Sequence, residues 1–117
     1  MFDKFQACLA KAVFSIPAVK GFEYGDGFKM ARMLGSQAND SFETSIDGRI
    51  HPVTNHSGGV QGGITNGEEV FFNVAFKPIP TIGHGSRHDV CALPRALVII
   101  EALTALTVMS FQKPKRT

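Results

Sequence analysis

Apolar side chains recur at intervals of three and four positions near the N-terminus. They are Phe2, Phe5, Leu9, Ala12, Val13 and Ile16. This spacing places them on one face of a helix. Pro17 follows directly, and a proline interrupts the hydrogen bonding of a helix. We therefore expect an amphipathic helix over 2–16 that ends at Pro17.

Two further apolar patterns predict strands. Residues 19–24 alternate in character, and residues 70–76 form the strongest strand pattern of the chain. Both faces of 70–76 are largely apolar, so we expect this strand to be covered on both sides. Between the two strands, residues 28–34 predict a short helical segment that Gly35 closes.

The stretch 36–63 is rich in Ser, Asn, Asp, Thr and Gly and shows no apolar period. We expect a long loop there, and loops of this length in a compact domain tend to be functional or disordered. The dipeptide Asn66-Gly67 then predicts a hairpin-type turn that leads into the strand at 70–76.

The last predicted element is a helix that begins near Pro94 and ends near Phe111. Residues 96–111 are mostly apolar and contain Glu101 as their one charged residue, but they fall short of the roughly 20 apolar residues that a membrane span needs. We therefore expect a buried helix and no membrane partner. The order of elements is that of an α+β fold. Its sheet has few strands, which suggests that a larger partner segment completes it.

Composition supports a folded domain. The chain has 117 residues, of which 44% are hydrophobic and 19% charged, so we expect one globular domain over 1–117. A net charge of +2 gives no reason to expect a nucleic-acid partner. Cys8 and Cys91 form no paired motif, and the first residues lack the layout of a signal peptide. Reduced thiols and a cytoplasmic location are therefore expected.

Lys77 is the first candidate for binding an anion. It ends a predicted strand, and Thr81 lies four residues later, so that an ammonium and a hydroxyl group can hold one phosphate. Pro78 and Pro80 would stiffen the segment between them. The alternative is an ordinary surface lysine. The glycine-rich run 58–63 can also cradle a phosphate, but it lacks the P-loop pattern and is more typical of turns.

The triplet Arg87-His88-Asp89 is the densest group of ionisable residues. It combines an anion-binding guanidinium, a titrating imidazole and a carboxylate just before the last helix. The alternative is that Asp89 caps this region and that Arg87 is an exposed charge. The four histidines lack the spacing of metal ligands, so no metal site is expected.

A series of short strings, taken in order, resembles the C-terminal part of chorismate synthases. The strings lie at 15–21, 25–28, 35–40, 54–59, 62–67, 76–78, 87–89 and 94–96. The resemblance implies the family's β-α-β sandwich fold, of which this chain would be a C-terminal fragment. It also implies a carbon–oxygen lyase that converts 5-enolpyruvylshikimate 3-phosphate to chorismate by anti-1,4-elimination of phosphate. The family needs reduced FMN and usually forms a homotetramer.

The resemblance also implies roles for individual residues. The segment that holds the flavin phosphate would consist of Lys77, Pro78, Ile79, Pro80 and Thr81. Pro17 and Ala18 would line the cofactor, and Gly62 would allow the backbone to approach it closely. Arg87 would contact the flavin, and Asp89 would be the catalytic carboxylate that manages the proton on flavin N5.

The chain also departs from the family pattern. The family is much longer, and its N-terminal part carries the two catalytic histidines and most substrate-binding arginines. The family's insertion between Thr81 and Arg87 is also reduced here to five residues. We therefore expect the isolated chain to be inactive as a synthase. The alternative function is a non-enzymatic remnant that acts as an interaction or oligomerisation module.

Overall fold

The computed structural model describes residues 2–78 and 93–112 of the chain. In chain order the helices and strands are α1 (Phe5–Phe14), β1 (Val19–Tyr24), the 3₁₀ helix η1 (Gly27–Arg32), α2 (Gly35–Ala38), β2 (Phe42–Thr44), β3 (Ile50–Pro52), β4 (Val60–Gln61), β5 (Ile64–Thr65), β6 (Phe72–Phe76) and α3 (Leu93–Phe111). The chain combines helices with small antiparallel sheets, which confirms the predicted α+β class.

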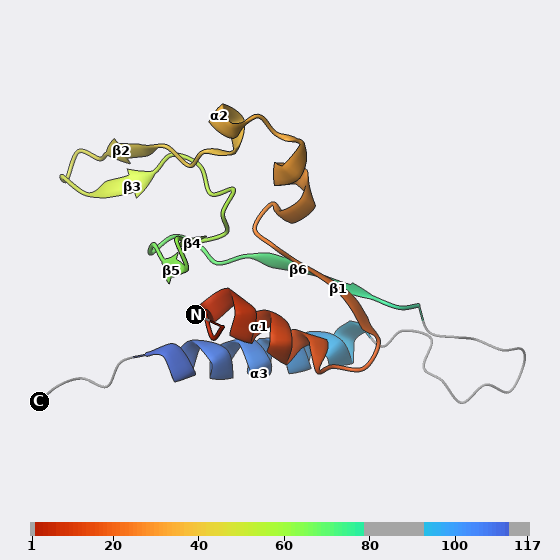
Figure 1. Cartoon of the computed structure of the whole chain (residues 1–117). Helices are drawn as coiled ribbons and strands as arrows, with labels where there is room; N and C mark the ends of the chain where they lie inside the picture. Colours follow the sequence, from red (N-terminus) through yellow and green to blue (C-terminus); the bar gives the residue numbers. More distant parts are fainter. Residues whose placement is uncertain (1, 79–92, 113–117) are drawn as a thin grey trace, which may run out of the picture.

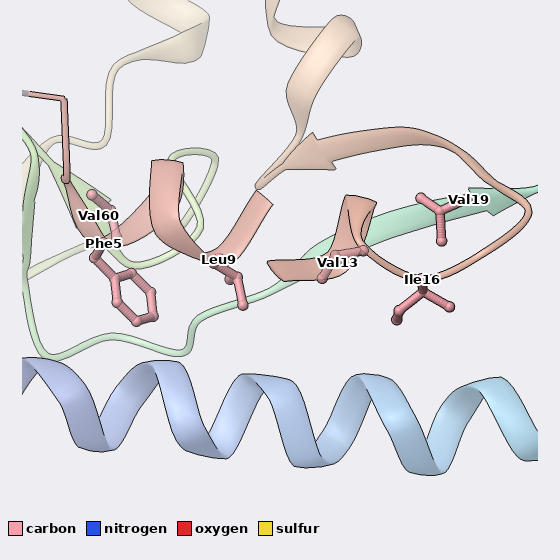
Figure 2. Packing of buried hydrophobic residues seen from close by; sticks show 6 residues of the cluster. All are labelled: Phe5, Leu9, Val13, Ile16, Val19 and Val60. Carbon is pink, nitrogen blue, oxygen red and sulfur yellow. The ribbon is translucent and has the colours of Figure 1, made fainter. Parts of the chain in front are cut away.

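The helices α1 and α3 lie side by side along the β1–β6 ribbon (Figure 1). The predicted apolar stripe of α1 does face the core, although the helix begins at Phe5 and Phe2 stays exposed. The core cluster consists of Phe5, Leu9, Val13, Ile16, Val19 and Val60. Figure 2 shows Phe5, Leu9 and Ile16 pointing toward α3. The Phe5 ring packs edge-on against Phe111 at a centroid distance of 5.6 Å.

The strands β1 and β6 form an antiparallel pair, in which Phe22 lies opposite Val74. One face of this strand pair packs against the core cluster. The residues on that face are Phe22, Phe72, Val74 and Phe76. The alternate residues Asn73 and Ala75 are exposed. In the described part of the chain the prediction that β6 is covered on both sides is therefore wrong. Strict alternation along the strand directs all its large side chains to one face.

The stretch 36–63 is not one long loop, contrary to the prediction. It contains the hairpin β2–β3, and β4 near its end pairs with β5 in a second hairpin. The two strands β4 and β5 are joined by Gly62 and Gly63, whose φ angles are 58° and 80°. Two consecutive positive φ angles are typical of a type I′ hairpin turn, which glycine adopts most readily.

Two predicted turn positions are also wrong. The hairpin turn lies at Gly62–Gly63, whereas the Asn66 side chain accepts a hydrogen bond from the Glu68 N–H at 3.0 Å in a local turn. Gly35 does not close a helix. It is the first residue of α2, and its φ angle is not positive. The Gln37 side chain accepts a hydrogen bond from the Leu34 N–H at 3.0 Å, so α2 starts with its own side-chain cap.

The helix α3 has the predicted extent but not the predicted burial. Only Ala96 and Thr107 are buried along it, while Leu97 and Met109 are 64% and 65% exposed. One side of α3 packs on α1, and its other side contacts no described element closely enough to be covered. By length and composition α3 could also cross a membrane, a test that core helices of soluble proteins pass too.

Candidate functional site

The sheet brings four of the predicted cofactor residues together. Val19, the first residue of β1, lies opposite Phe76, the last residue of β6. The segment before β1 and the segment after β6 therefore run beside each other. The Lys77 N–H donates a hydrogen bond to the Ala18 carbonyl oxygen at 2.7 Å. Pro17 and Ala18 thus lie next to Lys77 and Pro78, although the two pairs are about 60 positions apart in the sequence.

The Pro17–Ala18 segment is a tight turn that is fixed at both ends. The Val19 N–H donates to the Ile16 carbonyl oxygen at 3.3 Å, and the side chains of Ile16 and Val19 are both buried. Pro17 and Ala18 themselves are exposed. Ala18 has a φ of 71°, and it is the one non-glycine residue with a positive φ in the described ranges 2–78 and 93–112.

Lys77 meets the requirements for a phosphate ligand. Its side chain is exposed, and among the described residues it forms no ion pair with a carboxylate. Its backbone is held by the hydrogen bond to Ala18, so the side chain that carries the ammonium group extends from a fixed backbone position. A lysine of this kind can bind a phosphate as a point charge with three donors. The residues present here therefore fit the phosphate end of a flavin cofactor.

Gly62 lies elsewhere in the fold. A Cβ atom on its neighbour Gly63 would be 3.2 Å from Cδ of Lys4, which precedes α1, whereas Ala18 follows α1. The ten residues of α1 give a helix about 15 Å long, so Gly62 and Lys77 lie near opposite ends of it. The structure does not bring these two predicted residues together, and the conformation of Gly62 is explained by its hairpin turn.

Five other predicted site residues lie outside the described residues. They are Ile79, Pro80, Thr81, Arg87 and Asp89. Their predicted roles stay predictions. Within the described residues no three His, Cys, Asp or Glu side chains come close enough to hold a metal ion.

The sequence analysis missed a polar cluster around Asp40. This carboxylate is buried and accepts hydrogen bonds from the Thr54 hydroxyl, the His56 N–H and the Ser57 N–H at 2.7, 2.8 and 2.9 Å. Burial alone would raise the pKa of Asp40, but the hydrogen bonds from Thr54, Ser57 and His56 outweigh it and lower the pKa below its ordinary value. Asp40 therefore fixes the loop 54–57 from a distance of 14 to 17 positions in sequence.

A histidine–carboxylate pair joins this loop to the end of β1. His56 Nδ1 and Asp26 Oδ2 are 2.5 Å apart, and the Asp26 N–H donates to the His56 carbonyl oxygen at 2.9 Å. Gly25 lies directly against the same loop, because a Cβ there would come within 2.4 Å of the His56 oxygen. No signal in the sequence marked these contacts, since the partners are about 30 positions apart.

Comparison with known proteins identifies the family of this chain. The protein-family model for chorismate synthase matches residues 1–112. The chain belongs to the chorismate synthase family. It is 47% identical to the chorismate synthase of Cytophaga hutchinsonii over 128 aligned positions, which cover 95% of this chain and 35% of that protein. It is 50% identical to the chorismate synthase of Opitutus terrae over 125 positions, which cover 93% of this chain and 34% of that protein.

A solved structure supports the same conclusion for the fold. A crystal structure of chorismate synthase superposes with a TM-score of 0.77 at 39% sequence identity, covering 90% of this chain and 29% of that one. The predicted chorismate-synthase fold is therefore confirmed. The chain spans about a third of the length of these relatives. The Cytophaga alignment has 128 positions against 117 residues here, so that relative contains residues with no counterpart in this chain.

Proposed function

We propose that this chain supplies part of the cofactor site of a chorismate synthase. The reaction is the anti-1,4-elimination of phosphate from 5-enolpyruvylshikimate 3-phosphate, which leaves chorismate. Reduced FMN, when bound, supplies electron density as the phosphate leaves and recovers it with the departing hydrogen. The proposal rests on membership of the family and on one observation, the 2.7 Å bond that joins Lys77 to the Pro17–Ala18 turn.

In this proposal each predicted residue has a separate task. Lys77, with the segment that continues to Thr81, holds the phosphate group of the flavin. Pro17 and Ala18 line the cofactor beside it. Gly62 lies near the other end of α1 and would contact a different part of the cofactor. Arg87 contacts the flavin, and Asp89 handles the proton at N5, as their shared triplet in the family pattern implies.

Equilibrium titration of the purified chain with FMN tests the role of Lys77. We expect Lys77→Ala to weaken binding by between about tenfold and a hundredfold, since a charge-assisted hydrogen bond to phosphate is lost. Riboflavin lacks the phosphate, so its affinity should not change. Lys29→Ala, which removes an exposed lysine from η1, is the matched control and should bind FMN like the wild type. Equal FMN affinity for Lys77→Ala and the wild type would overturn the phosphate assignment.

The 117-residue polypeptide on its own should not form chorismate. It covers 34–35% of the length of the synthases that it matches, and the family places its catalytic histidines in a part with no counterpart here. The check is an anaerobic assay of the purified chain with reduced FMN and 5-enolpyruvylshikimate 3-phosphate, in which absorbance follows chorismate. Turnover above that of a heat-denatured sample would contradict this expectation.

A second candidate function follows from the exposed side of α3. An apolar surface of this kind favours self-association, as the alternative of an oligomerisation module requires. The residues that form this surface are Leu97, Val98, Leu106 and Met109, each more than 60% exposed. Light scattering should then detect a discrete oligomer that Leu97→Glu dissociates. Polydisperse aggregate would contradict a specific module.

As part of the main proposal, we place the protein in the cytoplasm, in a homotetramer of the kind usual in the family.

A further inference from the structure

The outer side of α3 combines a broad apolar surface with a single charge. Leu97, Val98, Leu106 and Met109 are each more than 60% exposed there, while the opposite side of the helix packs on α1. In Figure 1, α1 and the β1–β6 ribbon lie on one side of α3, and no described element covers its other side. An exposed apolar patch of this kind is typical of a surface that binds another protein.

Glu101 lies near the middle of this surface. It follows Leu97 and Val98 by four and three positions and precedes Ala105 by four, a spacing that places these residues on one side of the helix. Its side chain is exposed, and no hydrogen bond or ion pair joins it to a residue in the ranges 2–78 and 93–112. Covering a carboxylate with apolar groups is costly unless a counter-charge pairs with it. A partner that covers this surface is therefore expected to place a basic side chain opposite Glu101.

This charge argues against two other occupants of the surface. In a symmetric dimer both copies use the same surface, so the two Glu101 side chains near its centre would come close together, and like charges oppose association. The helix α3 is also long and apolar enough to cross a membrane, but lipid tails supply no counter-charge for a carboxylate. Neither a second copy nor a lipid bilayer therefore satisfies Glu101.

The relatives of this chain contain a large part that it lacks. The crystal structure of chorismate synthase superposes on it over 29% of that chain, and the Opitutus terrae synthase aligns with it over 34% of its length. We propose that the outer side of α3 binds the remaining part of a chorismate synthase as a separate polypeptide, which places a basic side chain opposite Glu101. This inference rests on the proposed function, in which the chain supplies only part of the cofactor site.

Co-expression of this chain with the part of the Opitutus terrae synthase that lies outside their alignment tests the proposal. A complex of the two polypeptides should co-purify, and sedimentation at decreasing concentration gives its Kd. Glu101→Gln keeps the size of the side chain and should raise the Kd by about ten- to a hundredfold, because the basic group of the partner is left without its counter-charge. Glu69→Gln, at an exposed position outside α3, is the matched control and should keep the wild-type Kd.

Two further samples separate a weak interface from a failure to fold. The isolated Glu101→Gln chain should melt at the wild-type temperature, since the carboxylate has no partner among the described residues. The aligned part of the Opitutus terrae synthase, co-expressed with the same partner, is the positive control. If that pair forms a complex and this chain does not, the inference is overturned. An equal Kd for Glu101→Gln and Glu69→Gln overturns the role of the charge.

Sedimentation of the isolated chain gives a second measurement, which does not depend on folding of the partner and decides the question if neither pair co-purifies. We expect the wild-type chain to stay monomeric at the concentrations at which the complex forms. A discrete dimer that Glu101→Gln strengthens would show that the surface binds a second copy and would overturn the inference. Binding of the chain to phosphatidylcholine vesicles that Glu101→Gln strengthens would overturn it in favour of a bilayer.

The inference and the proposed function fail in different experiments. If Lys77→Ala weakens FMN binding but no complex forms beside the positive control, the interface is overturned and the phosphate assignment stands. If the complex forms and weakens in Glu101→Gln, while Lys77→Ala leaves FMN affinity unchanged, the interface stands and the phosphate assignment is overturned.

Discussion

Gly25 and Gly48 have the same backbone requirement in different surroundings. Their φ angles are 58° and 83°, so both occupy the left-handed region that disfavours other residues. A Cβ atom on Gly25 would lie 2.4 Å from the His56 oxygen and 2.8 Å from the Gly58 nitrogen, whereas nothing lies within 4 Å of a Cβ on Gly48. Substitutions at the two positions therefore separate the cost of backbone strain from the cost of a close contact.

Substitution by alanine at these two positions should differ in its effect on stability. Gly48→Ala should lower the free energy of unfolding by about 1 kcal/mol, from the strain of a positive φ alone. Gly25→Ala should lower it by about 1–3 kcal/mol more, since the loop 56–58 must move. Urea denaturation followed by circular dichroism measures both. Equal losses would show that the contact between Gly25 and this loop is not present in solution.

The buried carboxylate of Asp40 should make stability depend on pH. Its pKa is lower in the folded chain than the ordinary value of about 3.9, because hydrogen bonds favour the charged form. Its contribution is therefore fully present above the unfolded pKa and is lost as the pH falls through the folded pKa. We expect the urea midpoint to fall steeply from about pH 5 downward.

Asp40→Asn should reduce this steep fall in the urea midpoint, since the side chain no longer titrates. It should also lower the free energy of unfolding at pH 7 by about 1–3 kcal/mol, because an amide cannot accept all three hydrogen bonds. Asp3→Asn, at an exposed position, is the control and should keep the wild-type pH profile. If the two variants have the same profile, the Asp40 cluster does not form in solution.

At the scale of elements, the apolar stripe of α1 is buried, whereas the outer side of α3 is exposed. Leu9 is fully buried between the two helices, whereas Leu97 is 64% exposed. Leu9→Ala should therefore lower the free energy of unfolding by about 2–5 kcal/mol. Leu97→Ala makes the same chemical change at an exposed position and should cost less than about 0.5 kcal/mol in the isolated chain. Thermal melts of both variants measure the difference, and similar losses would mean that α3 is covered in solution.

The sequence predicted the elements that have a clear apolar period. The spacing of Phe5, Leu9 and Val13 predicted α1, the alternating character of residues 19–24 predicted β1, and apolar runs predicted β6 and α3. The hairpin β2–β3 escaped prediction because its strands have three residues each and little apolar pattern. The burial of α3 was overestimated, since composition reports how apolar a helix is and not what covers it.

The candidate site was predictable only in part. Lys77 followed from its place at a strand end, and the motifs pointed to Pro17 and Ala18. The strained φ of Ala18 was not predicted, although the proline before it is typical of the second position of a type II turn. The Asp40 and His56 contacts join residues 14 to 30 positions apart, and local pattern carries no information about such pairs.

At the scale of the whole molecule, the chain folds as one part of a larger architecture. It superposes on a crystal structure of chorismate synthase over 90% of its own length and 29% of the other chain. Its α1–α3 pair and β1–β6 ribbon place the Pro17–Ala18 turn beside Lys77 without any further element (Figure 1). We therefore propose that this chain alone carries a working phosphate end of a flavin site.

The most direct test of this claim is a thermal melt of the purified chain with and without excess reduced FMN under anaerobic conditions. A ligand that binds only the folded state raises the midpoint, and the rise grows with the logarithm of the ratio of ligand concentration to Kd. We predict a cooperative transition whose midpoint rises with reduced FMN in the wild type and in Lys29→Ala, and which shifts much less in Lys77→Ala. A midpoint that does not change with FMN, or that shifts equally in all three proteins, would contradict the proposed phosphate site.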